Sequence, residues 1–118
     1  MEYTKEEALR MIEISSTQAK EKVELAETLS VLEKNRHFKK LFLEYYLDKY
    51  CRRLVELRAN PSMQDDGNQK FIDNQLTAMG HLAQFMNFIE QEGNQAKRLL
   101  AQNAEELDYI QNSANEEE

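Results

Sequence analysis

Few residues of this chain have side chains suited to chemistry. The 118 residues include two histidines, His37 and His81, and one cysteine, Cys51. They form no HExxH motif and no cysteine pair, and protein metal sites need several such ligands at close spacing. The run Asp65–Asn68 lacks the alternating ligands and the closing Glu of a calcium loop, so we predict a turn there. The sequence therefore predicts no metal ion and no cofactor.

Motifs for phosphate binding and covalent catalysis are also missing. The chain has no GxxxxGK[ST], GxGxxG or GxSxG sequence. Adjacent carboxylates such as Glu105 and Glu106 diverge on a helix, whereas acid–base catalysis needs groups opposed in a cleft. We therefore expect no enzymatic activity. Since Cys51 has no partner for an intramolecular disulfide, a reducing intracellular compartment is favoured, with this thiol packed in the core.

One stretch combines basic and aromatic side chains. Residues 34–58 hold eight Lys or Arg against three acids, a net charge of +5, whereas the rest of the chain holds seven against nineteen, or −12. Amines for phosphates and rings for stacking are what a binder of single-stranded nucleic acid offers. The candidate contacts with phosphate or with an acidic partner are Arg36, Lys39, Lys40, Lys49, Arg52 and Arg53, and the candidate interface rings are Phe38, Phe42, Tyr45, Tyr46 and Tyr50.

Helical periodicity argues against nucleic-acid binding here. At ~100° per residue, the apolar side chains of the first half, such as Leu41 and Phe42, lie opposite those of the second half, such as Leu47 and Leu54. A surface that follows phosphates should instead be continuous. The net charge of −7 also disfavours DNA and anionic membranes. We predict a helix packed on both sides by protein, with nucleic-acid binding as the alternative.

The composition predicts an all-α protein. One proline, three glycines and 41% apolar residues favour a helical chain that buries a core. No apolar run approaches the ~20 residues of a membrane span. We predict one domain over residues 1–118, an elongated three-helix protein with a long C-terminal helix, arranged as a helical hairpin or bundle. The expected helices span about 4–34, 36–59 and 69–111, followed by an acidic tail, 112–118.

Capping residues set these boundaries. Thr4 and Glu7 match the capping box that opens a helix. Asn35 is suited to cap the second helix, which must end near Asn60 because a proline follows. Asp65 or Asp66 is suited to cap the third helix. We expect that helix to continue through Gly93, because the apolar stripe has the same phase on both sides of the glycine.

Two apolar stripes predict packing of the coiled-coil type. The first helix carries mostly small residues in steps of three and four, and larger neighbours widen the stripe at both ends. The long third helix has more apolar surface than the second can cover, so we expect self-association. The first stripe comprises Leu9, Ile12, Ser16, Ala19, Val23, Ala26 and Ser30, widened by Met11, Ile14, Leu25, Leu29 and Leu32. The third-helix stripe comprises Phe71, Ile72, Met79, Leu82, Phe85, Met86, Ile89, Ala96, Leu100, Ala104 and Leu107.

Residues 35–90 carry a resemblance to a known family. The set comprises Asn35, Phe38, Lys39, Leu43, Tyr46, Arg53, Leu54, Val55 and Leu57, the run ANPSMQ at 59–64 and the run TAMGHL at 77–82. It resembles small all-helical accessory proteins encoded by tailed bacteriophages. The resemblance implies no catalytic residues. It implies a particle component, an assembly factor or an early protein that binds host machinery.

These observations predict a non-enzymatic protein that acts through protein–protein contacts. The function expected is a structural or assembly role in a tailed-phage virion, in the bacterial host cytoplasm or in the particle itself. The partners expected are further copies of the chain and other phage structural proteins, with no membrane. An alternative is an inhibitor of a host protein that imitates nucleic acid with its acidic ends. A nucleic-acid-binding module built on residues 36–58 is a second alternative.

Overall fold

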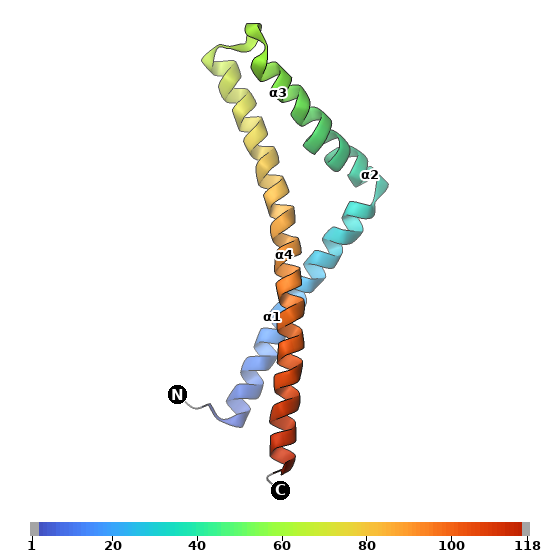
Figure 1. Ribbon diagram of the computed structural model, residues 1–118, viewed down its shortest axis with the longest axis vertical. Coiled ribbons are helices and arrows are strands. Elements are labelled where there is room, and N and C mark those ends of the chain that lie inside the picture. The colour runs from blue at the N-terminus through green and yellow to red at the C-terminus, as the bar shows by residue number, and fades with distance from the viewer. Residues whose placement is uncertain (1–2, 117–118) are drawn as a thin grey trace. The chain divides into compact units, whose positions relative to one another are not determined.

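A computed structural model describes residues 3–116 and the side chains of residues 3–113 (Figure 1). The described residues form helices joined by short turns, without any strand, which confirms the all-α prediction. In chain order the elements are α1 (Lys5–Lys34), α2 (Arg36–Phe38), the π-helix η1 (Lys39–Tyr50), α3 (Cys51–Ala59), the 3₁₀-helix η2 (Pro61–Met63) and α4 (Asp66–Glu116). The long C-terminal helix is therefore also confirmed.

The first two helices begin at the predicted caps. The Glu7 amide donates to Thr4 Oγ1 at 3.1 Å, and the Thr4 amide donates to Glu7 Oε2 at 3.4 Å, which completes the capping box. The side chain of Asn35 accepts from the amides of His37 and Phe38 at 2.9 and 3.1 Å. Local hydrogen bonding thus fixes where α1 starts and where the chain re-enters a helix after α1.

Helix α4 is longer than predicted at both ends. Asp65 Oδ2 accepts from the Asn68 amide at 3.0 Å, so this cap starts the helix at Asp66 rather than near residue 69. At the other end the helix runs to Glu116, because residues 112–116 contain neither glycine nor proline. The predicted acidic tail is thus helical as far as residue 116, and residues 117–118 lie outside the described part. Gly93 lies within the helix, as predicted.

The chain folds into two compact units, which are described separately. Unit 1 comprises Met1–Glu27 and Ile89–Glu118, and unit 2 comprises Thr28–Phe88. Helices α1 and α4 each contribute residues to both units.

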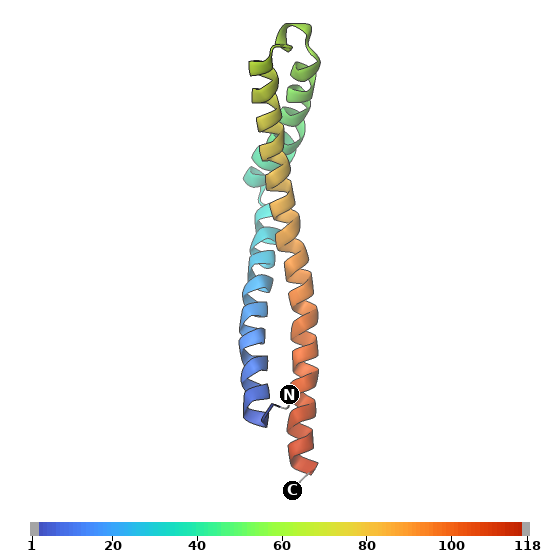
Figure 2. The ribbon, with the colours of Figure 1, turned by 90° about the vertical axis from the view of Figure 1, so that its left-hand side faces the viewer.

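In unit 1, α1 and the C-terminal half of α4 run antiparallel, side by side (Figure 2). The buried side chains between them are mostly small: Ala19 and Ala96 are 2% and 3% exposed, and Ile12 is 9% exposed. Lys22 Nζ lies 3.0 Å from Glu92 Oε2 at the edge of this seam. The small-residue stripe predicted for α1 is confirmed from Leu9 to Ala26, all of whose members are buried or half-buried, whereas Ser30 is exposed.

Gly93 marks the closest approach of the two helices of unit 1. A Cβ atom placed on Gly93 would overlap the Cβ of Ala26 and would lie 3.5 Å from the Lys22 carbonyl oxygen. Since these obstacles are a first side-chain carbon and a backbone atom, neither can turn aside. The seam therefore requires glycine at this position for steric reasons, although glycine weakens a helix by itself.

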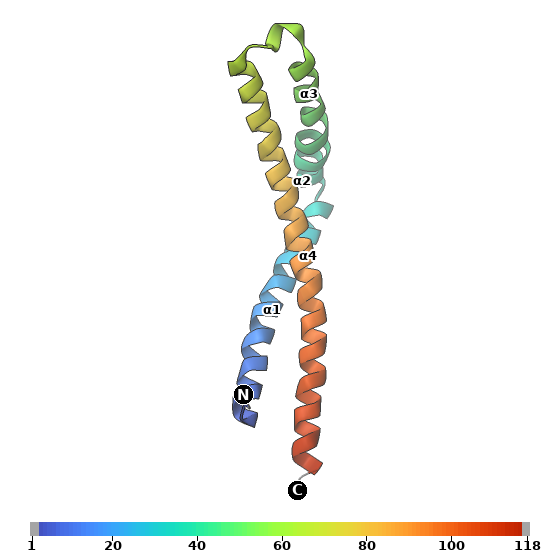
Figure 3. The ribbon, with the colours of Figure 1, turned by 60° about the vertical axis from the view of Figure 1, so that its left-hand side comes forward.

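Unit 2 is a helical hairpin with a larger-residue core. Helix α3 and the beginning of α4 lie side by side below the turn that joins them (Figure 3). Leu54, Ile72 and Met79 are 1–3% exposed and form the centre of the core. Arg58 Nη1 bridges the two helices to Asp73 Oδ1 at 3.0 Å. The half-buried residues packed on this core are Tyr46, Leu47, Tyr50, Cys51, Leu57, Met63 and Leu76.

Glutamine side chains close the hairpin turn. Gln69 Nε2 donates to the carbonyl oxygens of Arg58 and Met63 at 3.1 and 2.7 Å. Gln64 Nε2 donates to the carbonyl oxygens of Arg58 and Asn60, each at 2.8 Å. The carbonyl of Arg58 is one that the end of α3 leaves without a helical partner, and both glutamines donate to it. The two side chains thus tie the end of α3 to the turn and to the start of α4.

Several residues of the predicted stripes are exposed. Phe71 and Phe85 are 56% and 59% exposed, and Ala104 is exposed as well. The neighbouring residue is packed in each case: Ile72 beside Phe71, Met86 beside Phe85 and Asn103 beside Ala104. The packed positions of α4 alternate in steps of three and four, so a neighbour displaced by one residue turns ~100° away from the seam. Residues predicted to widen the α1 stripe are likewise exposed, namely Met11, Ile14, Leu25 and Leu32.

Candidate functional site

The predicted interface rings form a row in unit 2. Phe38 stacks on Phe42 with ring centroids 5.1 Å apart, Phe42 meets Tyr46 edge-on at 6.2 Å, and Tyr46 stacks on Tyr50 at 6.3 Å. All four side chains are half-buried. Tyr46 and Tyr50 also pack on the core of unit 2. These four rings thus already have partners within the chain.

Spacing along the helix accounts for this row. Its members are four residues apart, and side chains at that spacing are neighbours on a helix. η1 is a π-helix, which closes hydrogen bonds between residues five apart, so four residues fall just short of one turn there. The sequence analysis assumed ~100° per residue and placed the apolar side chains of the first half of this stretch opposite those of the second half. The ring contacts from Phe38 to Tyr50 run from the first half into the second. π-Helical segments are frequent at functional sites.

Tyr45 differs from the other four rings. It is 47% exposed, yet its ring stacks on Tyr50 with centroids 5.9 Å apart and an interplanar angle of 21°. Because Tyr50 is held by the core, Tyr45 is oriented without being covered. An exposed aromatic side chain with a fixed orientation loses little conformational entropy on binding, which makes it a favourable contact for a partner.

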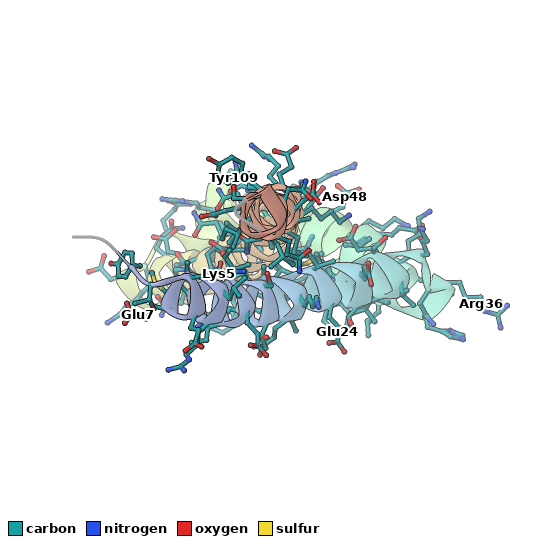
Figure 4. All side chains as sticks on the ribbon, turned by 90° about the horizontal axis from the view of Figure 1, so that it is seen from below. Lys5, Glu7, Glu24, Arg36, Asp48 and Tyr109 are labelled. Atoms are coloured by element: carbon teal, nitrogen blue, oxygen red, sulfur yellow. The ribbon has the colours of Figure 1, made fainter. Side chains whose placement is uncertain are left out.

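The six predicted basic contacts are all exposed. Arg36 projects outward at the end of its helix (Figure 4). Arg52 is engaged locally, since its Nε and Nη2 atoms donate to Asp48 Oδ1 and Oδ2 at 2.8 and 2.9 Å. For Lys39, Lys40, Lys49 and Arg53 the structure gives no ion pair within the described residues. Most of the predicted basic side chains are thus accessible to a partner.

A depression of about 460 Å³ lies along α2 and η1 and gathers part of this set. Leu41 and Tyr45 supply apolar surface to it and are 58% and 47% exposed. We call this surface the Tyr45 face. It is lined by His37, Lys40, Leu41, Glu44, Tyr45 and Lys49. The structure therefore brings two of the predicted basic residues and one predicted ring together with His37, Leu41 and Glu44, which were not among the predicted contacts.

A second exposed surface, at the C-terminal end of α4 in unit 1, was missed by the sequence analysis. Residues 99–113 carry three acids and no base, and the sequence beyond them ends in Glu116–Glu118. Leu99 and Tyr109 are 39% and 73% exposed within this stretch. We call residues 99–113 the acidic segment. The sequence does contain a signal for this surface: Leu99, Gln102, Glu106 and Tyr109 are three or four residues apart, so they share one face of the helix beside the packed stripe.

The remaining candidates for chemistry do not assemble into a site. Among the described residues, no group of three or more His, Cys, Asp or Glu side chains is placed to hold a metal ion. His81 is exposed on α4. Cys51 is a free thiol, half-buried and packed on the core of unit 2, in line with the prediction of a structural role.

Two further findings complete the description of the chain. In the described part of the chain, none of the helices combines the length and the apolar character needed to cross a membrane. Comparison of the chain with protein-family models, with curated proteins and with solved structures finds no match.

Proposed function

We propose that this protein acts by binding other proteins, as a structural or assembly component of a tailed-phage particle. The observation that supports protein binding most directly is the Tyr45 face, which presents an oriented ring and a leucine between basic side chains. Interfaces between proteins are enriched in Tyr and surround an apolar centre with a polar rim. The resemblance of residues 35–90 to phage accessory proteins supports the setting, which is the cytoplasm of a bacterial host during particle assembly.

Exposed apolar side chains elsewhere in unit 2 add support. No residue of α2, of η1 or of the α4 stretch 80–88 is buried. Phe85 and Phe88 are 59% and 53% exposed, and Val31 is 71% exposed. Single exposed apolar residues are common, but large ones gathered within one unit favour burial against a partner.

The composition of purified particles tests this proposal. We expect mass spectrometry to find the protein in mature particles or in assembly intermediates, at a constant copy number relative to the major capsid protein. We also expect a phage without the gene to accumulate incomplete particles. Absence from every particle form, with normal assembly of the deletion phage, would contradict the proposal.

The acidic surface of unit 1 favours a second candidate, an inhibitor of a host protein that imitates nucleic acid. Unit 1 carries six basic and fifteen acidic residues, a net charge of −9. An inhibitor should appear early in infection, should be absent from particles and should compete with DNA for its host target. The particle measurement therefore separates the two candidates.

A further inference from the structure

The two exposed surfaces differ in charge and share an apolar component. We infer that the Tyr45 face of one copy binds the acidic segment of a second copy, so that the protein associates head to tail. The inference rests on the proposed function, because it names one protein partner of the Tyr45 face.

Charge complementarity carries the choice of partner. Residues 34–58, which contain the whole Tyr45 face, have a net charge of +5, and residues 99–118 hold six acids and no base. The two sets belong to different units of the chain. Opposite charges brought together at an interface steer the encounter and reject partners of the wrong sign.

The apolar side chains on the two surfaces are similar in number and kind. The Tyr45 face exposes one aliphatic and one tyrosine side chain, Leu41 and Tyr45, and the acidic segment exposes another such pair, Leu99 and Tyr109. On α4, Leu99 and Tyr109 are separated by Gln102 and Glu106 in steps of three and four, so all four lie on one face of the helix. Glu105 and Glu106 are exposed one turn before Tyr109 and flank it, whereas Asp108 is turned ~100° away from Tyr109. Leu99 and Tyr109 are about 15 Å apart along α4, farther than Leu41 and Tyr45 along η1. Tyr109 alone can therefore lie over Leu41 and Tyr45 while Glu105 and Glu106 meet lysines.

Nucleic acid fits the Tyr45 face less well. Glu44 lines the depression itself, and Asp48 holds Arg52 in a bidentate pair, so the positive surface is interrupted. Unit 2 as a whole has nine basic and seven acidic residues, a net charge of only +2. An acidic, partly apolar helix tolerates such an interruption, whereas a phosphate backbone repeats its charge at every nucleotide.

Head-to-tail contact has a consequence for assembly. The two surfaces are different patches, so the contact is heterologous, and each added copy leaves one Tyr45 face and one acidic segment free. Such a contact produces a closed ring or an open chain of copies rather than a simple two-fold dimer.

Paired charge reversals test the contact. One variant carries Lys40→Glu and Lys49→Glu, a second carries Glu105→Lys and Glu106→Lys, and a third combines all four changes. All four side chains are exposed, so folding should be retained, which circular dichroism checks. Controls with equal changes in charge are Lys5→Glu with Lys70→Glu, and Glu13→Lys with Glu21→Lys, which also alter exposed residues.

Sedimentation velocity over a concentration series is the measurement. We expect the parent to associate reversibly, more weakly at high salt, and each two-residue variant at the contact to associate at least about tenfold more weakly. The combined variant should regain association. Each control should change association only as its net charge predicts: slightly stronger for Glu13→Lys with Glu21→Lys, and slightly weaker for Lys5→Glu with Lys70→Glu. The second variant is the most informative, because lowering the net negative charge should strengthen association unless these acids form the contact.

Two results would overturn the inference. One is a parent that stays monomeric at all concentrations, whether or not it binds a short single-stranded DNA through Lys40 and Lys49. The other is a combined variant that does not recover. Neither of them removes the proposed function by itself. A monomer found at constant copy number in particles still binds another particle protein, and the particle measurement reports that independently.

Discussion

The two units hold their helices together with side chains of different size. In unit 1 the buried residues are mainly Ala19, Ala96 and Gly93, and the helices approach so closely that a methyl group on the glycine has no room. In unit 2 the buried residues are Leu54, Ile72 and Met79, with tyrosines around them. A small-residue seam gains close contact but little buried apolar area per residue, whereas a large-residue core gains area. Unit 1 should therefore be sensitive to added volume, and unit 2 to removed volume.

The largest expected effect is the loss of volume in unit 2. Leu54→Ala should lower the free energy of unfolding by about 2–5 kcal/mol, because it removes a fully buried side chain and leaves a cavity. Urea denaturation followed by circular dichroism measures this change. Val55→Ala, at the exposed neighbouring position, is the control and should have little effect. Equal effects of the two changes would show that Leu54 is not the centre of the core.

The next effect is the addition of volume in unit 1. Gly93→Ala should destabilise by about 1–2 kcal/mol net, since overpacking costs more than the roughly 1 kcal/mol that alanine gains over glycine in a helix. Gly80→Ala should stabilise, by about 1 kcal/mol, because no atom lies within 4 Å of the added Cβ. Thermal and urea melts of both variants check the opposite signs.

A third variant decides whether the overlap itself is the cause. Ala26→Gly combined with Gly93→Ala removes the opposing Cβ and should recover part of the lost stability. If both single alanine substitutions stabilise the protein, the seam of unit 1 is looser than described and the contrast between the units fails.

A smaller effect is expected at the buried polar residue of unit 1. Asn103 is 7% exposed, and its Nδ2 donates to Ser15 Oγ at 3.2 Å and to Ser16 Oγ at 3.0 Å. Asn103→Ala should cost about 1 kcal/mol, the usual net value of such hydrogen bonds. Gln102→Ala on the exposed side of the helix is the matched control. A change in stability for Gln102→Ala as large as for Asn103→Ala would mean that helix propensity, not the buried hydrogen bonds, is being measured.

The smallest effect concerns pH and the hairpin of unit 2. The hydrogen bond from the backbone amide of Asn68, followed by that from its side chain, lowers the pKa of Asp65 below its usual value of 3.8. A carboxylate with a lowered folded-state pKa stabilises the fold at pH above its unfolded-state pKa, and this contribution is lost as the pH falls through the folded-state pKa. In the Asp65→Asn variant the free energy of unfolding, measured as a function of pH, should therefore fall slightly less as the pH is lowered into the acid range. An unchanged acid limb would show that the cap does not depend on the charge of Asp65.

Elements with a local signal could be predicted from the sequence. The capping box at Thr4 and Glu7, the cap at Asn35 and the end of the second helix at Asn60 each depend on a few neighbouring residues, and all are present. The start of α4 was placed three residues too late because the run Asp65–Asn68 was predicted to be a turn. Gly67 and Asn68 instead belong to the first turn of the helix that Asp65 caps.

Features that depend on another helix could not be predicted. Phe71 and Phe85 are exposed because α4 packs a neighbouring side against its partner helix. The spacing of the apolar residues alone would allow either side of α4 to pack. The π-helix of η1 has no apolar periodicity of its own, so the row from Phe38 to Tyr50 was assigned to two sides. Of the candidate site, residue type alone found Tyr45, Lys40 and Lys49, whereas Leu41 emerged only from its exposure.

The hydrogen bonds of Asn103 have one further consequence, for the alignment of the two helices of unit 1. Ala19 and Ala26 lie one heptad apart in α1, so the small residues alone would permit a slide that places Ala19 instead of Ala26 opposite Gly93. Such a shift would bring Asn103 opposite Leu9, where no hydroxyl accepts its protons, and an unsatisfied buried amide costs about 1–3 kcal/mol. A single polar residue in an apolar seam fixes the register of paired helices in this way. Asn103 therefore selects one of two registers that both place an alanine opposite Gly93.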